Sequence, residues 1–98
     1  MVRAMETTLS KEYRRICRDP ANHQPLAYLR LRQAIRNVVQ QHDVEPGHAL
    51  PSERDLALVL KLSRVTVRKA IAGLVEEGLL TQRHGAGTFI AERIVKPM

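Results

Sequence analysis

Two short helical segments that stand only three residues apart constrain this chain more than any other feature. The first begins after Ser52 and the second begins after Ser63, and Gly78 follows the second. Serine is a preferred N-cap, because its hydroxyl accepts a hydrogen bond from a backbone N–H of the first turn. Glycine is the common residue just past a helix C-terminus. The spacing therefore predicts a helix-turn-helix unit over residues 53–72.

The residues on either side of this unit complete a small fold. After Gly78 the apolar spacing changes from about 3.6 to about two residues, which indicates strands. Residues 79–83 and 88–91 are the strand candidates. Residues 26–42 have helical spacing, and residues 48–50 form a short extended stretch before Pro51. The order predicts a mainly α fold with a small β-hairpin, a winged helix-turn-helix with a three-helix core and a two-strand wing, over residues 26–91 with the wing at about 79–91.

Both ends of the chain lie outside this predicted domain. Residues 1–25 form a polar N-terminal extension, in which residues 8–18 place Leu9, Tyr13, Ile16 and Cys17 on one helical face. A helix of about ten residues is marginal alone, so it would need a surface to dock on. We expect this short helix to serve packing rather than function. Residues 92–98 are expected to begin a linker to an absent C-terminal domain.

Charge and composition narrow the classes of function. Sixteen Lys and Arg face ten Asp and Glu, a net charge of +6 with a pI near 10.3, which suggests nucleic acid or an anionic membrane surface as partner. Three aromatic residues are too few for base-stacking platforms. No run approaches the roughly 18 apolar residues of a membrane span, and no secretory signal is visible, so we expect a cytoplasmic protein without a membrane partner.

The sequence contains few signals of catalysis or metal binding. Ninety-eight residues are too few for a large enzyme with a deep pocket, and a single cysteine excludes an internal disulfide framework. The four histidines lack metal-ligand spacing, and no nucleophile arrangement or phosphate-binding glycine loop is present. We expect no enzyme activity, no cofactor and no metal. The histidines are His23, His42, His48 and His84.

The helix predicted at residues 64–77 has one apolar side, and a helical wheel assigns its residues to two faces. The inward residues are Val67, Ala70, Ile71 and Leu74, and the outward residues are Val65, Arg68, Lys69 and Ala72, with Arg64 and Thr66 on the two shoulders. In a helix-turn-helix unit the second helix lies in the major groove, and its N-terminal half reaches the base edges. The outward face carries cationic side chains near the start of the helix and small side chains further along, which allows the helix to approach a DNA groove closely.

Arg64 and Arg68 are the candidates for direct base contacts, because a guanidinium can donate two parallel hydrogen bonds to guanine. The alternative is that both are ordinary solvated arginines. Residues 61–69 contain no acidic residue that would pair with them. Val65 is predicted to meet a thymine methyl group, or else is a tolerated exposed valine.

Polar residues nearby are candidates for phosphate contacts. Ser63 and Thr66 could donate to phosphates, although Ser63 also caps its helix. Lys61 and Lys69 are predicted to contact phosphates rather than bases. Arg54, in the first turn of the preceding helix, is predicted to contact a phosphate or a base edge. Its alternative is an ion pair with a neighbouring acid, Glu53 or Asp55.

The predicted hairpin tip, His84 to Gly87, has features of a minor-groove contact. Gly85 and Gly87 allow the backbone to approach a narrow groove closely, while Arg83 or His84 supplies charge or donors. An isolated glycine hairpin usually has no ligand. Its attachment to a helix-turn-helix unit favours a wing that contacts DNA.

Four motifs in register resemble the GntR family of bacterial transcription regulators. They are LPSERDLA at 50–57, SRVTVRKA at 63–70, EGLL at 77–80 and GAGTF at 85–89. The resemblance covers about Pro25 to Ala91. It implies a winged helix-turn-helix that binds palindromic operators as a dimer, most often as a repressor, with a C-terminal domain for a small-molecule effector. It also implies DNA contacts by Arg54, Ser63, Arg64, Val65, Thr66, Arg68, His84 and Gly85.

Two positions depart from the family pattern, and two other functions stay open. Lys61 and His42 stand where the family often has glycine. If the turn at Lys61 needs a left-handed residue, lysine costs about 1 kcal/mol or more there; otherwise the turn differs slightly from that of the family. The alternatives to DNA binding alone are a winged-helix protein-interaction module without DNA readout, and the DNA-targeting segment of a fused enzyme.

Overall fold

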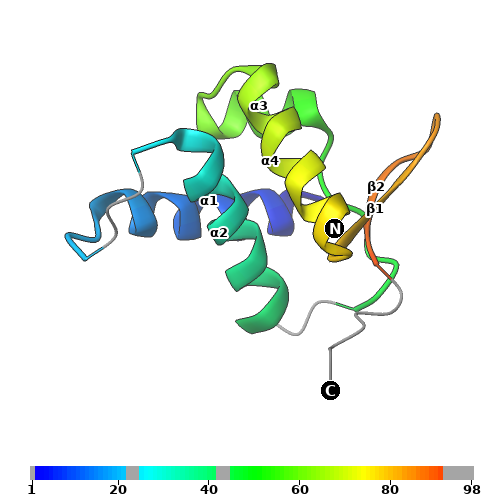
Figure 1. Cartoon of the computed structure of the whole chain (residues 1–98), viewed down its shortest axis with the longest axis horizontal. Helices are drawn as coiled ribbons and strands as arrows, with labels where there is room; N and C mark the ends of the chain where they lie inside the picture. The colour runs from blue at the N-terminus through cyan, green and yellow to red at the C-terminus, as the bar shows by residue number, and fades with distance from the viewer. Residues whose placement is uncertain (1, 22–24, 42–44, 92–98) are drawn as a thin grey trace.

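The computed structural model describes residues 2–21, 25–41 and 45–91. Within these ranges it contains four helices and one two-stranded antiparallel sheet (Figure 1). The elements are α1 (Val2–Arg18), α2 (Ala27–Gln41), α3 (Glu53–Leu60), α4 (Arg64–Glu77), β1 (Leu80–Arg83) and β2 (Gly87–Ile90). The predicted winged helix-turn-helix is confirmed, and α2, α3 and α4 are its three-helix core. His42 and the proposed linker at 92–98 lie outside the described residues.

Both predicted serine caps are present. Ser52 and Ser63 have extended backbones, and each side-chain oxygen accepts a hydrogen bond of 3.1 Å from the backbone N–H three residues on. The turn between the helices ends α3 at Lys61, which has φ 58° and ψ 44°, the left-handed conformation. The lysine therefore occupies a position that suits glycine, which is the first of the two alternatives that the departure from the family pattern left open.

The hairpin pairs Leu80 with Ile90 and Arg83 with Gly87, so each strand lies within one residue of its predicted bounds. The stretch predicted as a short strand at 48–50 forms only an isolated bridge, Ala49 to Phe89. It is nevertheless bonded to β2, because the Leu50 N–H donates to the Thr88 carbonyl at 2.9 Å. The base of the wing is therefore held by a segment that precedes α3.

The core is aliphatic, as the scarcity of aromatic residues predicted. Its largest fully buried side chains come from every helix and from both strands. They include Leu9, Leu31, Ile35, Leu56, Ile71, Leu74, Leu80 and Ile90. Burying each such side chain contributes about 1.5–3 kcal/mol relative to leaving it exposed.

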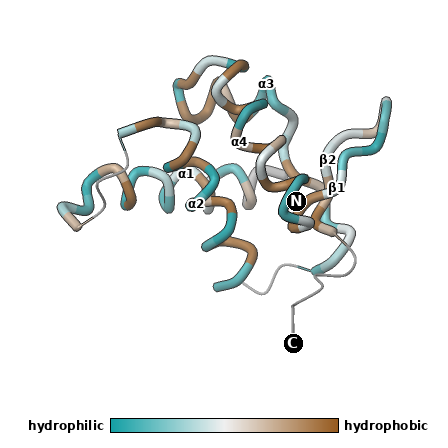
Figure 2. The backbone as a smooth tube through the Cα atoms, in the orientation of Figure 1, coloured by the Kyte–Doolittle hydropathy of each residue, from teal (hydrophilic) through white to brown (hydrophobic). Residues whose placement is uncertain are grey.

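The helix α1 is longer and more deeply packed than predicted, since it begins at Val2 rather than near residue 8. Hydrophobic and hydrophilic residues alternate along it (Figure 2), and Leu9, Tyr13 and Ile16 are buried where it packs against α2 and α3. Cys17 is exposed, so its predicted place on the apolar face was wrong. It lies one residue beyond the buried row, where the helix surface turns toward solvent.

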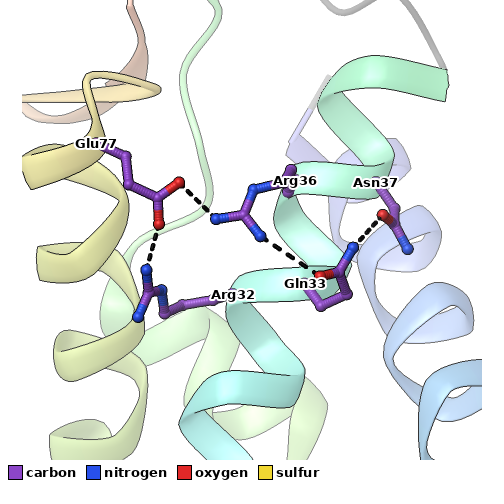
Figure 3. A network of polar contacts seen from close by, with 5 residues as sticks. All are labelled: Arg32, Gln33, Arg36, Asn37 and Glu77. Carbon is purple, nitrogen blue, oxygen red and sulfur yellow. Dashed lines mark hydrogen bonds and ion pairs between the residues drawn. The ribbon is translucent and has the colours of Figure 1, made fainter. Parts of the chain in front are cut away.

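A polar network links α2 and α4 beside this core (Figure 3), and one further hydrogen bond extends it to α1. Glu77 at the end of α4 accepts hydrogen bonds from Arg32 and from Arg36, the latter at 2.5 Å. The network continues through Gln33 to Asn37, which donates to Glu12 of α1 at 2.8 Å. The two guanidinium groups hold the pKa of Glu77 below its usual range.

None of the helices within the described residues combines the length and the apolar character that crossing a membrane requires.

Candidate nucleic-acid interface

The two faces of α4 are oriented as the helical wheel predicts. Val67, Ala70, Ile71 and Leu74 are completely buried. Val65 is 69% exposed, and Arg64, Arg68 and Lys69 are also exposed. Val65 has no packing role at this exposure, so the first half of α4 presents three cations and one apolar side chain to solvent.

The hydroxyl groups of Ser63 and Thr66 lie together at the N-terminus of α4. Their oxygens are 2.8 Å apart, and the Ser63 oxygen also accepts from the backbone N–H of Thr66. Ser63 is exposed and Thr66 half-buried. The structure thus shows the capping role of Ser63, and it leaves the pair at a helix N-terminus, where N–H groups and the helix dipole favour anions.

Glu53 also belongs to this surface, although from the sequence it was expected only as an alternative partner of Arg54. Its Oε1 lies 3.2 Å from Nη2 of Arg68 and 3.9 Å from Nη2 of Arg64. Nε of Arg68 donates to the same oxygen at 3.3 Å. Both arginines are therefore paired, although no acid lies near them in the sequence; the acid comes from the first turn of α3.

Arg54 differs from these two arginines in its contacts. It is exposed, and within the described residues it forms no ion pair with Glu53 or Asp55. The neighbouring-acid alternative for Arg54 is thus not what the structure shows. Its guanidinium is available to an external anion.

Lys69 lies toward α2 rather than toward the wing. Its Nζ is 4.3 Å from the centre of the Tyr28 ring, a cation–π contact that holds the amine at the start of α2. The side chain stays exposed. It extends the cationic surface of α4 toward the neighbouring helix.

The tip of the wing lies on the same side of the molecule as the first turns of α3 and α4, in the upper part of Figure 1. An open hollow of about 660 Å³ separates them, lined by Arg54, Arg64, His84 and the glycine tip, among others. Gly85 has φ +76°, which a side chain would strain, and His84 beside it is exposed. Arg83 lies over the Phe89 ring, with its guanidinium carbon 5.1 Å from the ring centre.

Of the predicted site residues, Arg54, Arg64, His84, Gly85 and Gly87 therefore line one hollow, whereas Lys69 lies apart, toward α2. This surface carries arginines suited to phosphates and to guanine edges, and hydroxyl groups at a helix N-terminus. It also carries a glycine turn whose backbone can approach a ligand closely. No cluster of His, Cys, Asp or Glu able to hold a metal ion occurs among the residues that the structure describes.

Fold and surface together define a winged helix-turn-helix domain. The family model "Bacterial regulatory proteins, gntR family" matches residues 27–90, and the chain belongs to this family.

Several regulators resemble this chain over the same region. The HTH-type transcriptional regulator GgaR of Escherichia coli K12 is 43% identical over 70 residues, 71% of this chain and 28% of that protein. The mannosyl-D-glycerate transport/metabolism system repressor MngR of the same strain is 40% identical over 73 residues, 74% of this chain and 30% of that protein. The chain thus spans less than a third of the length of these relatives.

Solved structures agree in fold. The DNA-binding domain of AraR in complex with operator ORX1 has a TM-score of 0.63 and 38% identity, covering 65% of this chain and 77% of that one. A transcriptional regulator from Oenococcus oeni has a TM-score of 0.68 and 32% identity, covering 74% of this chain and 60% of that one.

Proposed function

We propose that this chain is a sequence-specific double-stranded DNA-binding domain of a transcription regulator. The carrying observation is that Arg54 of α3, Arg64 of α4 and the glycine tip of the wing line one hollow, while Val65 and Arg68 of α4 are exposed. The operator-bound AraR domain, at 38% identity, supports the same use of the fold. In this proposal α4 enters the major groove and the wing follows the adjacent minor groove.

Each residue has a role that its place in the structure supports. Arg64 and Arg68 donate to guanine, and Val65 meets a thymine methyl group between them. Arg54, Lys69 and the Ser63–Thr66 hydroxyl pair bind phosphates on either side of α4. His84, Gly85 and Gly87 enter the minor groove.

The larger context of the domain is also a proposal. We infer a cytoplasmic repressor, without enzyme activity or cofactor, that binds a palindromic operator as a homodimer and responds to a small molecule through a C-terminal domain. The repressor role is supported by the name of the related repressor MngR. The further domain is supported by the relatives, of whose length this chain covers less than a third. One domain alone would bind a half-site weakly, because the second half adds avidity only in a dimer.

Selection from a randomised duplex pool, followed by fluorescence anisotropy, tests the proposal. The selected duplex and a scrambled duplex of equal length are titrated across a salt series. We expect the selected duplex to bind more tightly. Arg68→Ala should lose about tenfold or more in affinity for it, since a bidentate arginine–guanine pair is worth about 1–3 kcal/mol.

The matched control is Arg15→Ala, which removes an arginine from α1. It should leave the preference for the selected duplex unchanged. Equal binding of both duplexes by the unmodified chain, with no effect of Arg68→Ala, would contradict the proposal and favour a protein-interaction module.

A further inference from the structure

The solvent side of α1 carries three cationic side chains, Lys11, Arg14 and Arg18, which we name the α1 basic face. They recur at helical spacing, opposite the side on which Leu9 and Ile16 are buried. The three side chains are all exposed. A helix needs only its apolar side to dock on a core, so packing alone does not account for a row of like charges on the other side.

These three charges are not neutralised by nearby acids. Arg15, the fourth cation in this part of α1, is paired with Glu12 at 2.5 Å. Within residues 2–21, 25–41 and 45–91, by contrast, Lys11, Arg14 and Arg18 form no ion pair. With Arg15 and Asp19 they line an open hollow of about 620 Å³.

The α1 basic face is remote from the surface proposed to bind the operator. The C-terminal end of α1 and the wing tip lie on opposite sides of the molecule in Figure 1. The helix packs against α2 and α3, so its position relative to the domain is set by the core. It also precedes residues 27–90, the part that matches the family. An anion bound there cannot be held by α4 and the wing at the same time.

We propose that the α1 basic face binds the phosphate backbone of a second DNA duplex, so that one chain holds two DNA segments. This rests on the proposed function, because α4 and the wing hold the first segment.

The chemistry of the face favours DNA over other polyanions. An amphipathic helix that binds a membrane inserts its apolar side, and the apolar side of α1 is buried in the core. A protein interface needs a central apolar anchor, whereas the three side chains named here are cations. Exposed arginine and lysine without such an anchor suit a sequence-independent phosphate contact.

A sandwich assay tests the proposal. The selected operator duplex is immobilised, loaded with the full chain and washed, and a labelled duplex of unrelated sequence is added. We expect capture of the label at low salt. The logarithm of the association constant for the second duplex should fall with log salt at a slope of about −2.7, since three phosphate contacts each contribute about −0.9.

Charge-removing variants locate the contact. Combining Lys11→Gln, Arg14→Gln and Arg18→Gln should reduce capture about tenfold or more, with operator affinity unchanged. The matched single variants Arg14→Gln and Arg15→Gln remove the same charge from adjacent positions. Only Arg14→Gln should weaken capture clearly, because Arg15 is already paired with Glu12. Circular dichroism checks that each variant is folded.

Other outcomes overturn the proposal in distinct ways. Unchanged capture by the triple variant would place the second duplex elsewhere, as on the second operator surface of a dimer. Equal losses of capture and operator affinity would mean that α1 contacts the operator duplex itself. If no operator can be selected, the proposed function fails instead. In that case, the binding of one random duplex is measured for Arg68→Ala alone and for Arg68→Ala combined with the triple variant. Equal binding by the two variants would refute the proposed role of the α1 basic face.

Discussion

The carboxylate of Glu53 lies between the side chains of Arg64 and Arg68 and holds both against the first turn of α3. Arg68 donates its Nε proton to this oxygen, and its Nη2 lies 3.2 Å from the same oxygen as an ion pair. A guanidinium has five N–H donors, so Nη1 stays available for a base edge. Under the proposed function, this contact orders Arg68 in the free protein and places a negative charge where DNA phosphates would approach.

Replacing Glu53 with Gln tests this ordering. The affinity for scrambled duplex should rise, because a charge that repels phosphate is removed. The ratio of selected to scrambled affinity should fall about fivefold, since the exposed charge pair that orders the arginines is worth about 1 kcal/mol. Fluorescence anisotropy with both duplexes measures the ratio. Asp55→Asn removes a charge from the same turn without touching the arginines, and an equal fall in its ratio would refute the role of Glu53.

Lys61 has a backbone conformation that glycine adopts without strain. Left-handed geometry costs an ordinary residue about 1–2 kcal/mol, and the greater freedom of glycine in the unfolded chain offsets part of that. Lys61→Gly should therefore raise the free energy of unfolding by about 0.5 kcal/mol. Urea denaturation measures the change. Lys61→Ala keeps the strained backbone and should not raise the free energy of unfolding. An equal increase in both variants would show that loss of the lysine side chain, and not relief of backbone strain, causes the stabilisation.

Between elements, α2 and α4 are held together by Glu77 and two arginines. The Arg32 side chain passes over Gly73, where an added Cβ would lie 2.9 Å from the guanidinium carbon. Glycine inside a helix costs about 1 kcal/mol relative to alanine. Here its missing side chain makes room for the arginine that reaches Glu77 (Figure 3). Gly73 thus lowers the helix propensity of α4, and in return it leaves room for the contact between Arg32 of α2 and Glu77 of α4.

The lowered pKa of Glu77 makes this pairing sensitive to acid. Because the folded-state pKa lies below the unfolded value, the stabilisation is complete above an ordinary glutamate pKa of about 4.3. It is lost as the pH falls through the lowered value. Glu77→Gln should reduce the free energy of unfolding at pH 7 by about 1 kcal/mol, a modest figure because the carboxylate is 34% exposed.

Urea denaturation at pH 7 and in the acid range measures this effect. The difference between Glu77→Gln and the unmodified chain should shrink toward pH 3. Glu76→Gln, at the exposed neighbouring position, is the control and should change stability little at either pH. A difference that is the same at both pH values would show that ionised Glu77 does not clamp the helices.

At the scale of the whole molecule, α1 belongs to the same core as the winged helix-turn-helix. Leu9 is 1% exposed, and it packs within one cluster that runs from α1 to the strands. Leu9→Ala should therefore lower the free energy of unfolding by about 2–5 kcal/mol in a single transition. Thr7→Ala on the exposed side should have little effect. A second, separate transition for α1 in Leu9→Ala would show that this helix is not part of the cooperative unit.

Much of this molecule follows from signals that act over a few residues. The serine caps, the left-handed turn and the amphipathic spacing of α4 depend on local backbone chemistry. The orientation of Val65 and Arg68 followed from spacing alone, since a buried stripe fixes the opposite face of its helix. The predicted extent of α1 was too short, because the helix begins at Val2 and already contributes Met5 to the core, ahead of the apolar row that set the predicted start.

Only the tertiary structure decided which distant residues meet. Glu53 reaches Arg68 across 15 positions, and Arg36 reaches Glu77 across 41. Long-range ion pairs of this kind depend on how helices cross, and neither spacing nor composition determines that. The separation of the α1 basic face from the wing is likewise a product of packing, because a helical wheel shows which side of a helix is polar but not which way that side faces in the folded molecule.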